Sequence, residues 1–122
     1  MSTQGNTTDL GICTAAANLS TSQFRFVKVT GNKQVNLCVA GDNAIGVLQN
    51  KPNTAQAAAV TFAGSSKVVA GAAIAAGALI ASDINGAAVA ASAGNYIIGI
   101  ALNAAGGAGE LISVLLRPGG KL

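Results

Sequence analysis

Two short stretches of this sequence are nearly the same. Residues 45–50 read IGVLQN, and residues 98–103 read IGIALN. The shift that superimposes these stretches also aligns residues outside them, namely Asn32 with Asn85, Ala40 with Ala93, Gly41 with Gly94 and Ala55 with Ala108. We call this shift of 53 residues, from Ile45 to Ile98, the repeat offset. A chain of 122 residues is about the size of one domain. We therefore predict one domain made of two units that follow the same plan.

Each unit contains the pattern of a β-hairpin. FRFVKVT at 24–30 alternates polar and apolar residues, Gly31-Asn32 marks a turn, and QVNLCVA at 34–40 places its valines and leucine on one face. In the second unit, Asn85-Gly86 is the strongest short hairpin signal, and it lies between two segments of strand length. Further strands are expected at 44–50, 57–64 and 66–71, each followed by glycine or a Pro52 loop.

A glycine lies at the second position of each repeated stretch, Gly46 and Gly99. Glycine inside a strand usually marks a bulge, a bend or a close approach of another backbone. We expect each of these strands to pass against its counterpart there. The fold class predicted is all-β: a small compact β-barrel or β-sandwich with an internal two-unit pseudo-repeat and approximate two-fold symmetry.

The alanine-rich middle of the chain is not expected to be a helix. Its large apolar residues do not recur at a spacing of three and four, and Gly71 and Gly77 would each cost about 1 kcal/mol relative to alanine. One helical turn near 72–76 stays open as an alternative. The closing segment ELISVLLR at 110–117 is almost continuously apolar and is expected to be buried on both faces.

The segment 1–22 differs from the rest of the chain. It is rich in Ser, Thr, Asn and Gly and shows no sustained period, so an extended N-terminal arm outside the core is predicted at 1–22, before a β domain at 23–122. We also expect the part from Thr3 to Ser22 to become ordered only on docking. The segment has no basic start followed by an apolar run, so a cleaved signal peptide is not expected.

Charged residues make up only 9% of the chain, against roughly 25% in typical domains. Just four residues carry a ring, Phe24, Phe26, Phe62 and Tyr96. Burying an alanine methyl contributes about 0.8 kcal/mol, against roughly 1.5–3 for a leucine or phenylalanine, so the core is thin. Flat surfaces of small residues are therefore expected to be covered by other chains. The net charge is +3, but the lysines and arginines are scattered singly along the chain, which disfavours nucleic-acid binding.

Residues that carry chemistry are scarce. The sequence has no histidine, and its carboxylates are Asp9, Asp42, Asp83 and Glu110. Asp42 and Asp83 belong to turn-like segments, and Ser65-Ser66-Lys67 is better explained as a turn between strands than as a nucleophile with its base. We expect no enzyme activity, no metal and no cofactor. Cys13 and Cys38 could pair, although free thiols are favoured. The apolar stretch 68–82 is too short and too broken to span a membrane.

From 41 to 116, runs such as GDNAIGVLQNKP, KVVAG, AGALIASDING and IGIALN followed by GELI occur in a fixed order. In this combination the sequence resembles the tailed-phage capsid decoration, or cement, proteins, and the resemblance covers about 24–116. It implies a compact β protein on the outer face of the phage head, made in the bacterial host cytoplasm, that stabilises the shell. The implied partners are the major capsid protein and further copies of this chain, as a homotrimer, without membrane or direct nucleic-acid binding.

The residues expected to contact the capsid or a neighbouring subunit are Thr7, Leu10, Ile12, Leu19, Phe24 and Arg25. The alternative function is a small β module that binds glycans or a host surface from the phage particle. Sugar sites usually present aromatic faces, and this chain has one tyrosine and no tryptophan, so that alternative ranks second.

Overall fold

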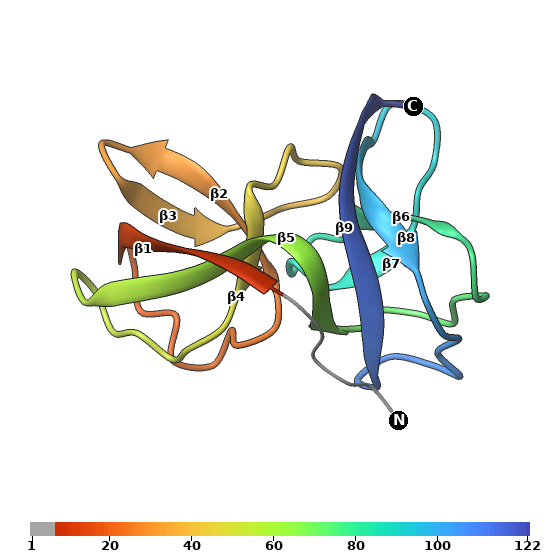
Figure 1. Cartoon of the computed structure of the whole chain (residues 1–122), viewed down its shortest axis with the longest axis horizontal. Coiled ribbons are helices and arrows are strands. Elements are labelled where there is room, and N and C mark those ends of the chain that lie inside the picture. Colours follow the sequence, from red (N-terminus) through yellow and green to blue (C-terminus); the bar gives the residue numbers. More distant parts are fainter. Residues whose placement is uncertain (1–6) are drawn as a thin grey trace.

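The computed structural model describes residues 7–122, with side chains from residue 13 onward. This part of the chain is all-β, as predicted, and contains nine strands (Figure 1). Their bounds are β1 Thr7–Ala15, β2 Phe26–Gly31, β3 Gln34–Leu37, β4 Gly46–Leu48, β5 Ala57–Val69, β6 Leu79–Ser82, β7 Ala88–Ala90, β8 Tyr96–Ala101 and β9 Leu111–Lys121.

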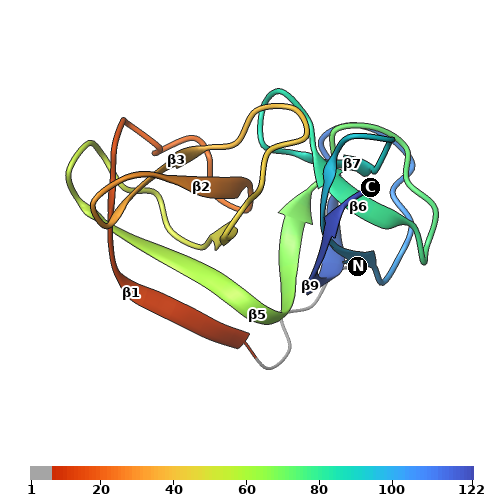
Figure 2. The same ribbon diagram turned by 90° about the horizontal axis from the view of Figure 1, so that it is seen from above.

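The strands form two units that share β5. The order along the sheet is β1-β3-β2-β4-β5-β9-β8-β6-β7, and β1 also pairs with β5. The first five strands therefore close into a barrel, which we call the first unit. β5 bends in its middle, where Gly64 has φ +84°, and its second half belongs to the other lobe of the molecule (Figure 2). There it pairs with β9 and begins the second unit, β5 to β9.

The two units have the same strand register. In the first hairpin Val27 pairs with Leu37, and at the repeat offset Ile80 pairs with Ala90. Likewise Phe26 pairs with Val47, and Leu79 pairs with Ile100. These pairings confirm the predicted repeat.

The repeat extends to the ends of each unit, with small changes of offset. Ala15 pairs with Val35 where β1 meets β3, and the equivalent in the second unit is a single bridge between Ala70 and Ala88. Ala70 directly follows β5, so the second half of β5 is the equivalent of β1. The predicted fold class, a small compact β-barrel with an internal two-unit repeat, is therefore confirmed. The barrel itself is closed by the first unit alone, and the second unit repeats the strand plan with a weaker closure.

Equivalent positions also build the two cores. Eight buried residues form the core of the first unit, and the residues at the equivalent positions are all buried in the second. In matching order they are Cys13, Ala15, Leu19, Val27, Val35, Leu48, Ala58 and Val60, and then Val68, Ala70, Ile74, Ile80, Ala88, Ala101, Ile112 and Val114. The second cluster also contains Phe26, Cys38 and Val47 from the first unit, so the two units are packed together by apolar side chains.

The repeated glycines lie where a neighbouring backbone comes close. A Cβ on Gly46 would lie 2.2 Å from the carbonyl oxygen of Thr61, and a Cβ on Gly99 would lie 2.2 Å from that of Leu115. The predicted close approach is thus confirmed. Its partner is different from the one predicted, because each glycine faces the next strand of its own unit, β5 or β9, rather than the other repeated strand.

The predicted N-terminal arm is wrong for the residues whose side chains the structure describes. Thr7–Ala15 forms β1, which pairs with β5 and β3, and Cys13, Ala15 and Leu19 are buried in the core of the first unit. The first unit closes its barrel with this strand, so 7–22 belongs to the β domain. Ordering of the segment from Thr3 to Ser22 on docking stays a prediction. Residues 1–6, including Thr3, lie outside the described residues.

Three further expectations are corrected or settled. The closing strand β9 buries Ile112, Val114 and Leu116 but exposes Leu111 and Leu115, so it is not buried on both faces. The alanine-rich segment 72–76 has no helical turn, and Ile74 within it bridges to Ala105. Cys13 and Cys38 are buried free thiols in different clusters.

Candidate functional site

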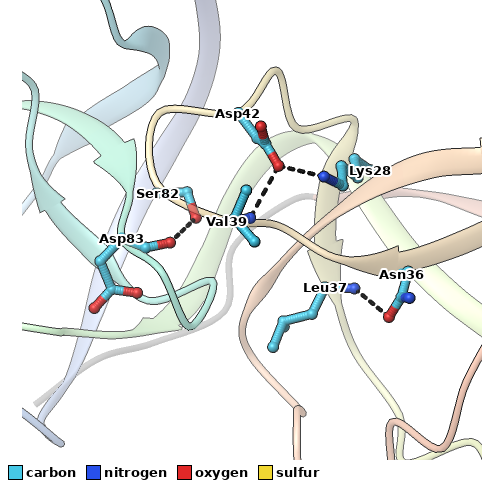
Figure 3. A network of polar contacts seen from close by, with 7 residues as sticks. All are labelled: Lys28, Asn36, Leu37, Val39, Asp42, Ser82 and Asp83. Carbon is cyan, nitrogen blue, oxygen red and sulfur yellow. Dashed lines mark hydrogen bonds and ion pairs between the residues drawn. The ribbon is translucent and has the colours of Figure 1, made fainter.

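The polar side chains of the described residues hold turns and strand ends in place. The carboxylate of Asp83 accepts hydrogen bonds from the N–H groups of Asn85 and Ala87, at 2.8 and 2.9 Å, inside the β6–β7 turn. Asp42 accepts from the N–H of Val39 at 2.9 Å (Figure 3). Both aspartates therefore do what the sequence predicted for turn residues. Among the residues whose side chains the structure describes, no group of three or more His, Cys, Asp or Glu residues is placed to hold a metal ion.

Lys28 and Asp42 form an ion pair on the surface of the first unit (Figure 3). The hydrogen bond from the Lys28 ammonium, together with that from the Val39 N–H, lowers the pKa of the Asp42 carboxyl, and the same pair raises the pKa of Lys28. Burial, with a smaller contribution from the Asp42 charge, raises the pKa of the nearby Cys38 thiol to about 12. A thiol with such a pKa stays protonated and unreactive at neutral pH.

Ser65-Ser66-Lys67 is not a turn between strands, as had been expected, but part of β5. The buried Ser66 hydroxyl accepts a hydrogen bond from the Gln49 side chain at 2.9 Å and donates to the carbonyl of Lys67 at 3.0 Å. The Lys67 ammonium lies 5.8 Å from the centre of the Phe24 ring. The contacts of Ser66 with Gln49 and of Lys67 with Phe24 join the two units.

Of the six predicted contact residues, three have described side chains. Leu19 is 3% exposed in the core of its own chain, so its assignment as a contact residue is corrected. Phe24 and Arg25 are half-buried at the junction of the units: the Phe24 carbonyl accepts from the Val69 N–H at 2.8 Å, and the Arg25 Nη1 donates to the Asn85 carbonyl at 3.0 Å. For Thr7, Leu10 and Ile12 only the backbone in β1 is described.

A surface that sequence reasoning missed lies across three strands of the second unit. Leu79 in β6 pairs with Ile100 in β8, which pairs with Leu115 in β9, so the three side chains share one face. Leu79 is 37% and Leu115 36% exposed. At its edge lies Leu102, 51% exposed, whose N–H continues the ladder to the carbonyl of Ser113. We call Leu79, Ile100, Leu102 and Leu115 the open face.

The equivalent row in the first unit is completely covered. Phe26 pairs with Val47, and Val47 pairs with Thr61, and all three residues are 0% exposed. We call this row the junction face, because Phe26 and Val47 belong to the same hydrophobic cluster as the core of the second unit. The repeat offset was the signal in the sequence that linked Leu79 to Phe26. The repeat offset does not indicate that the junction face is buried and the open face is exposed.

A small hollow lies between the two units. Ala44, Ile45, Gly46 and Phe62 line it from the first unit, and Ile98, Leu116 and Pro118 line it from the second. The lining contains no ionisable group that could act as an acid or base. The side chains that line it are apolar.

The comparisons with known proteins establish the fold. A structure described as the head fiber gp8.5 N base in bacteriophage phi29 is similar to this chain with a TM-score of 0.74. The match covers 96% of this chain and 98% of that chain, at 17% sequence identity. No protein-family model matches the sequence, and no curated protein matches it either. Within the described part of the chain, no helix has the length and apolar character needed to cross a bilayer.

Proposed function

We propose that this chain is a structural protein of a phage particle that attaches to the outer surface of the head. The observation that carries the proposal is the end-to-end likeness to the phi29 head fiber base, which involves both units and almost the whole of each chain. A likeness over a single barrel would be weaker support, because small barrels serve many functions.

The surface chemistry supports a binding role. Three exposed apolar side chains of the second unit, Leu79, Leu102 and Leu115, lie on the open face. Asp42, Asp83 and Ser66 are engaged in turns and in the junction between the units. We propose that the protein acts by adhesion and not as an enzyme. Attachment at several equivalent points would give a stable assembly even when each contact is weak.

Stabilisation of the shell is the finer part of the proposal. A rigid body that bridges neighbouring capsid subunits would oppose their separation, because anything that binds only the assembled state stabilises it. The proposed partner is the major capsid protein, with further copies of this chain beside it.

The test uses purified protein and phage heads that lack it. We expect the protein to sediment with the heads to a saturating, fixed ratio, and we expect decorated heads to release their DNA at a higher temperature than bare heads. Binding without any thermal effect would support attachment and refute stabilisation. No co-sedimentation at saturating concentration would refute the proposal as a whole, and a glycan array would then test the host-surface alternative.

A further inference from the structure

The internal repeat indicates what covers the open face. In the first unit, the junction face lies against the β6–β7 hairpin of the second unit. The Phe26 N–H donates to the Gly86 carbonyl at 2.8 Å, and the Gly41 N–H donates to the Ser82 carbonyl at 3.0 Å. Phe26 and Val47 are buried in the same cluster as the core of the second unit, and Thr61 beside them is also 0% exposed. The molecule thus contains one complete example of such a row docked on a hairpin.

The other copies of these two surfaces are both free in the isolated chain. The open face is the equivalent of the junction face, and the β2–β3 hairpin is the equivalent of the β6–β7 hairpin. Val29 on β2 is 54% exposed, whereas Ser82, its equivalent, is 2% exposed. Figure 1 shows the β2–β3 hairpin projecting from the side of the molecule away from the second unit.

The hairpin tip keeps the backbone shape that the internal contact uses. Lys33 has φ +56°, and Gly86, its equivalent, has φ +73°. Both hairpins therefore turn through the left-handed region at the same position, where a non-glycine residue is uncommon. Asn32, next to Lys33, is the equivalent of Asn85, whose carbonyl accepts the hydrogen bond of Arg25.

We propose that the open face of one copy binds the β2–β3 hairpin of a second copy, as the junction face binds the β6–β7 hairpin within the chain. The contact is heterologous, because two different surfaces meet, so successive copies form a ring or a chain. The inference concerns free protein and does not depend on the proposed function.

The contact between copies relies on side-chain packing more than the internal one does. The Lys33 carbonyl already accepts a hydrogen bond from the Thr14 N–H, and the Gly94 N–H donates to the Leu122 carbonyl of its own chain. These are the equivalents of Gly86 and Gly41 in the internal contact. Burial of Leu79, Ile100 and Leu115 against Val29 therefore provides the association energy, and loss of a central apolar residue should be costly.

The first experiment measures the mass of purified full-length protein by sedimentation velocity over a range of concentrations. We expect reversible self-association that Leu115→Asp and Val29→Asp each weaken about tenfold or more, since each would bury a charge in an apolar contact. Leu102→Asp, at an exposed position after β8, repeats the open-face test if Leu115→Asp does not fold. Ile84→Asp, at a side chain 69% exposed in the β6–β7 turn, is the matched control and should leave association unchanged.

The second experiment tests which surfaces meet. We expect a Leu79→Cys copy mixed with a Lys33→Cys copy to form a disulfide-linked pair, because their equivalents, Phe26 and Gly86, are joined by a backbone hydrogen bond. Cross-linking of Leu79→Cys copies only with each other would overturn the proposal in favour of a face-to-face dimer. Protein that stays monomeric at every concentration, or association that is insensitive to the open-face or the hairpin variant, would also overturn it.

Discussion

At the scale of single residues, equivalent positions keep their physical task while their identity changes. The Val39 N–H donates a hydrogen bond to the Asp42 carboxylate at 2.9 Å. In the second unit, the Ser92 N–H donates to the Asn95 side-chain oxygen, also at 2.9 Å. Both side chains offer an acceptor oxygen that closes the same turn. The charge of Asp42 is therefore not needed for the turn itself, and it serves the ion pair with Lys28.

We predict that Asp42→Asn keeps the turn and removes only the ion pair. The pKa of Asp42 is lowered from 3.8, so the pair stabilises the fold above that pH and its contribution is lost as the pH falls through the lower, folded-state value. The pKa of Lys28 is raised from 10.5, so the contribution is present below that pH and is lost as the pH rises through the higher value.

Urea unfolding from pH 2 to 11 measures this effect. Between the folded-state pKa values of Asp42 and Lys28, the free energy of unfolding of the wild type should exceed that of Asp42→Asn by a small margin, since exposed pairs contribute little. Outside this pH range the difference should shrink. Asp42→Ala, which also loses the acceptor for the Val39 N–H, should be less stable than Asp42→Asn at neutral pH. Equal stability of the two variants would contradict this role for the turn.

Gly46 and Gly99 carry a second prediction at this scale. A methyl group at either position would meet a backbone carbonyl at 2.2 Å, and backbone cannot move aside as a side chain can. Gly46→Ala and Gly99→Ala should each lower the free energy of unfolding by about 1–3 kcal/mol or more. Gly107→Ala is the matched control, because a Cβ there meets nothing within 4 Å. Denaturant unfolding measures all three, and a neutral Gly46→Ala would contradict the close approach.

At the scale of elements, β5 has two roles. Its first half closes the barrel of the first unit against β1 and β4, and its second half pairs with β9. Neither unit has its full set of strands without it. Two domains joined by a linker could unfold separately, but two units that share a strand are expected to unfold together.

We therefore predict a single cooperative unfolding transition. Hydrogen exchange should give the same global opening free energy for the most protected amides of β2 in the first unit and β8 in the second. Gly46→Ala in the first unit should lower both values by a similar amount. A change confined to the first unit would show that the units are energetically independent.

The sequence predicted those strands and turns whose residues are identical in the two units. Strands whose residues differ between the units were not recognised as equivalent. The Ile-Gly stretches and the hairpin turns made the repeat offset visible. The first strand was missed because Cys13 and Leu19 are replaced by Val68 and Ile74, and because the offset there is slightly larger. Equivalent core positions hold side chains of different size: the larger one is in the first unit for Val35 and Ala88, and in the second unit for Ala58 and Ile112. The two cores can therefore be filled without matching residues.

The candidate surface was harder to predict than the fold. A row of apolar residues such as Leu79 and Leu115 has the same pattern whether it is packed inside a molecule or open to a partner. Phe24 and Arg25 connect the two units within the chain, and their contact with the capsid or a neighbouring subunit stays a prediction. Only the spatial arrangement separates the buried row from the open one, because burial depends on which unit lies next to it.

At the scale of the whole molecule, low charge and small side chains suit a protein that functions in contact with others. Charged residues are 9% of the chain, and several of its exposed large side chains are apolar. A body of two units presents two sets of equivalent surfaces, of which one is buried inside the molecule and the other is exposed.

The most direct test of attachment to the head is electron cryomicroscopy of phage heads incubated with the purified protein. We predict added density on the outer surface, at repeated lattice positions, into which the two-unit body fits as a rigid whole. Heads that show no added density at a saturating protein concentration would contradict the proposed function.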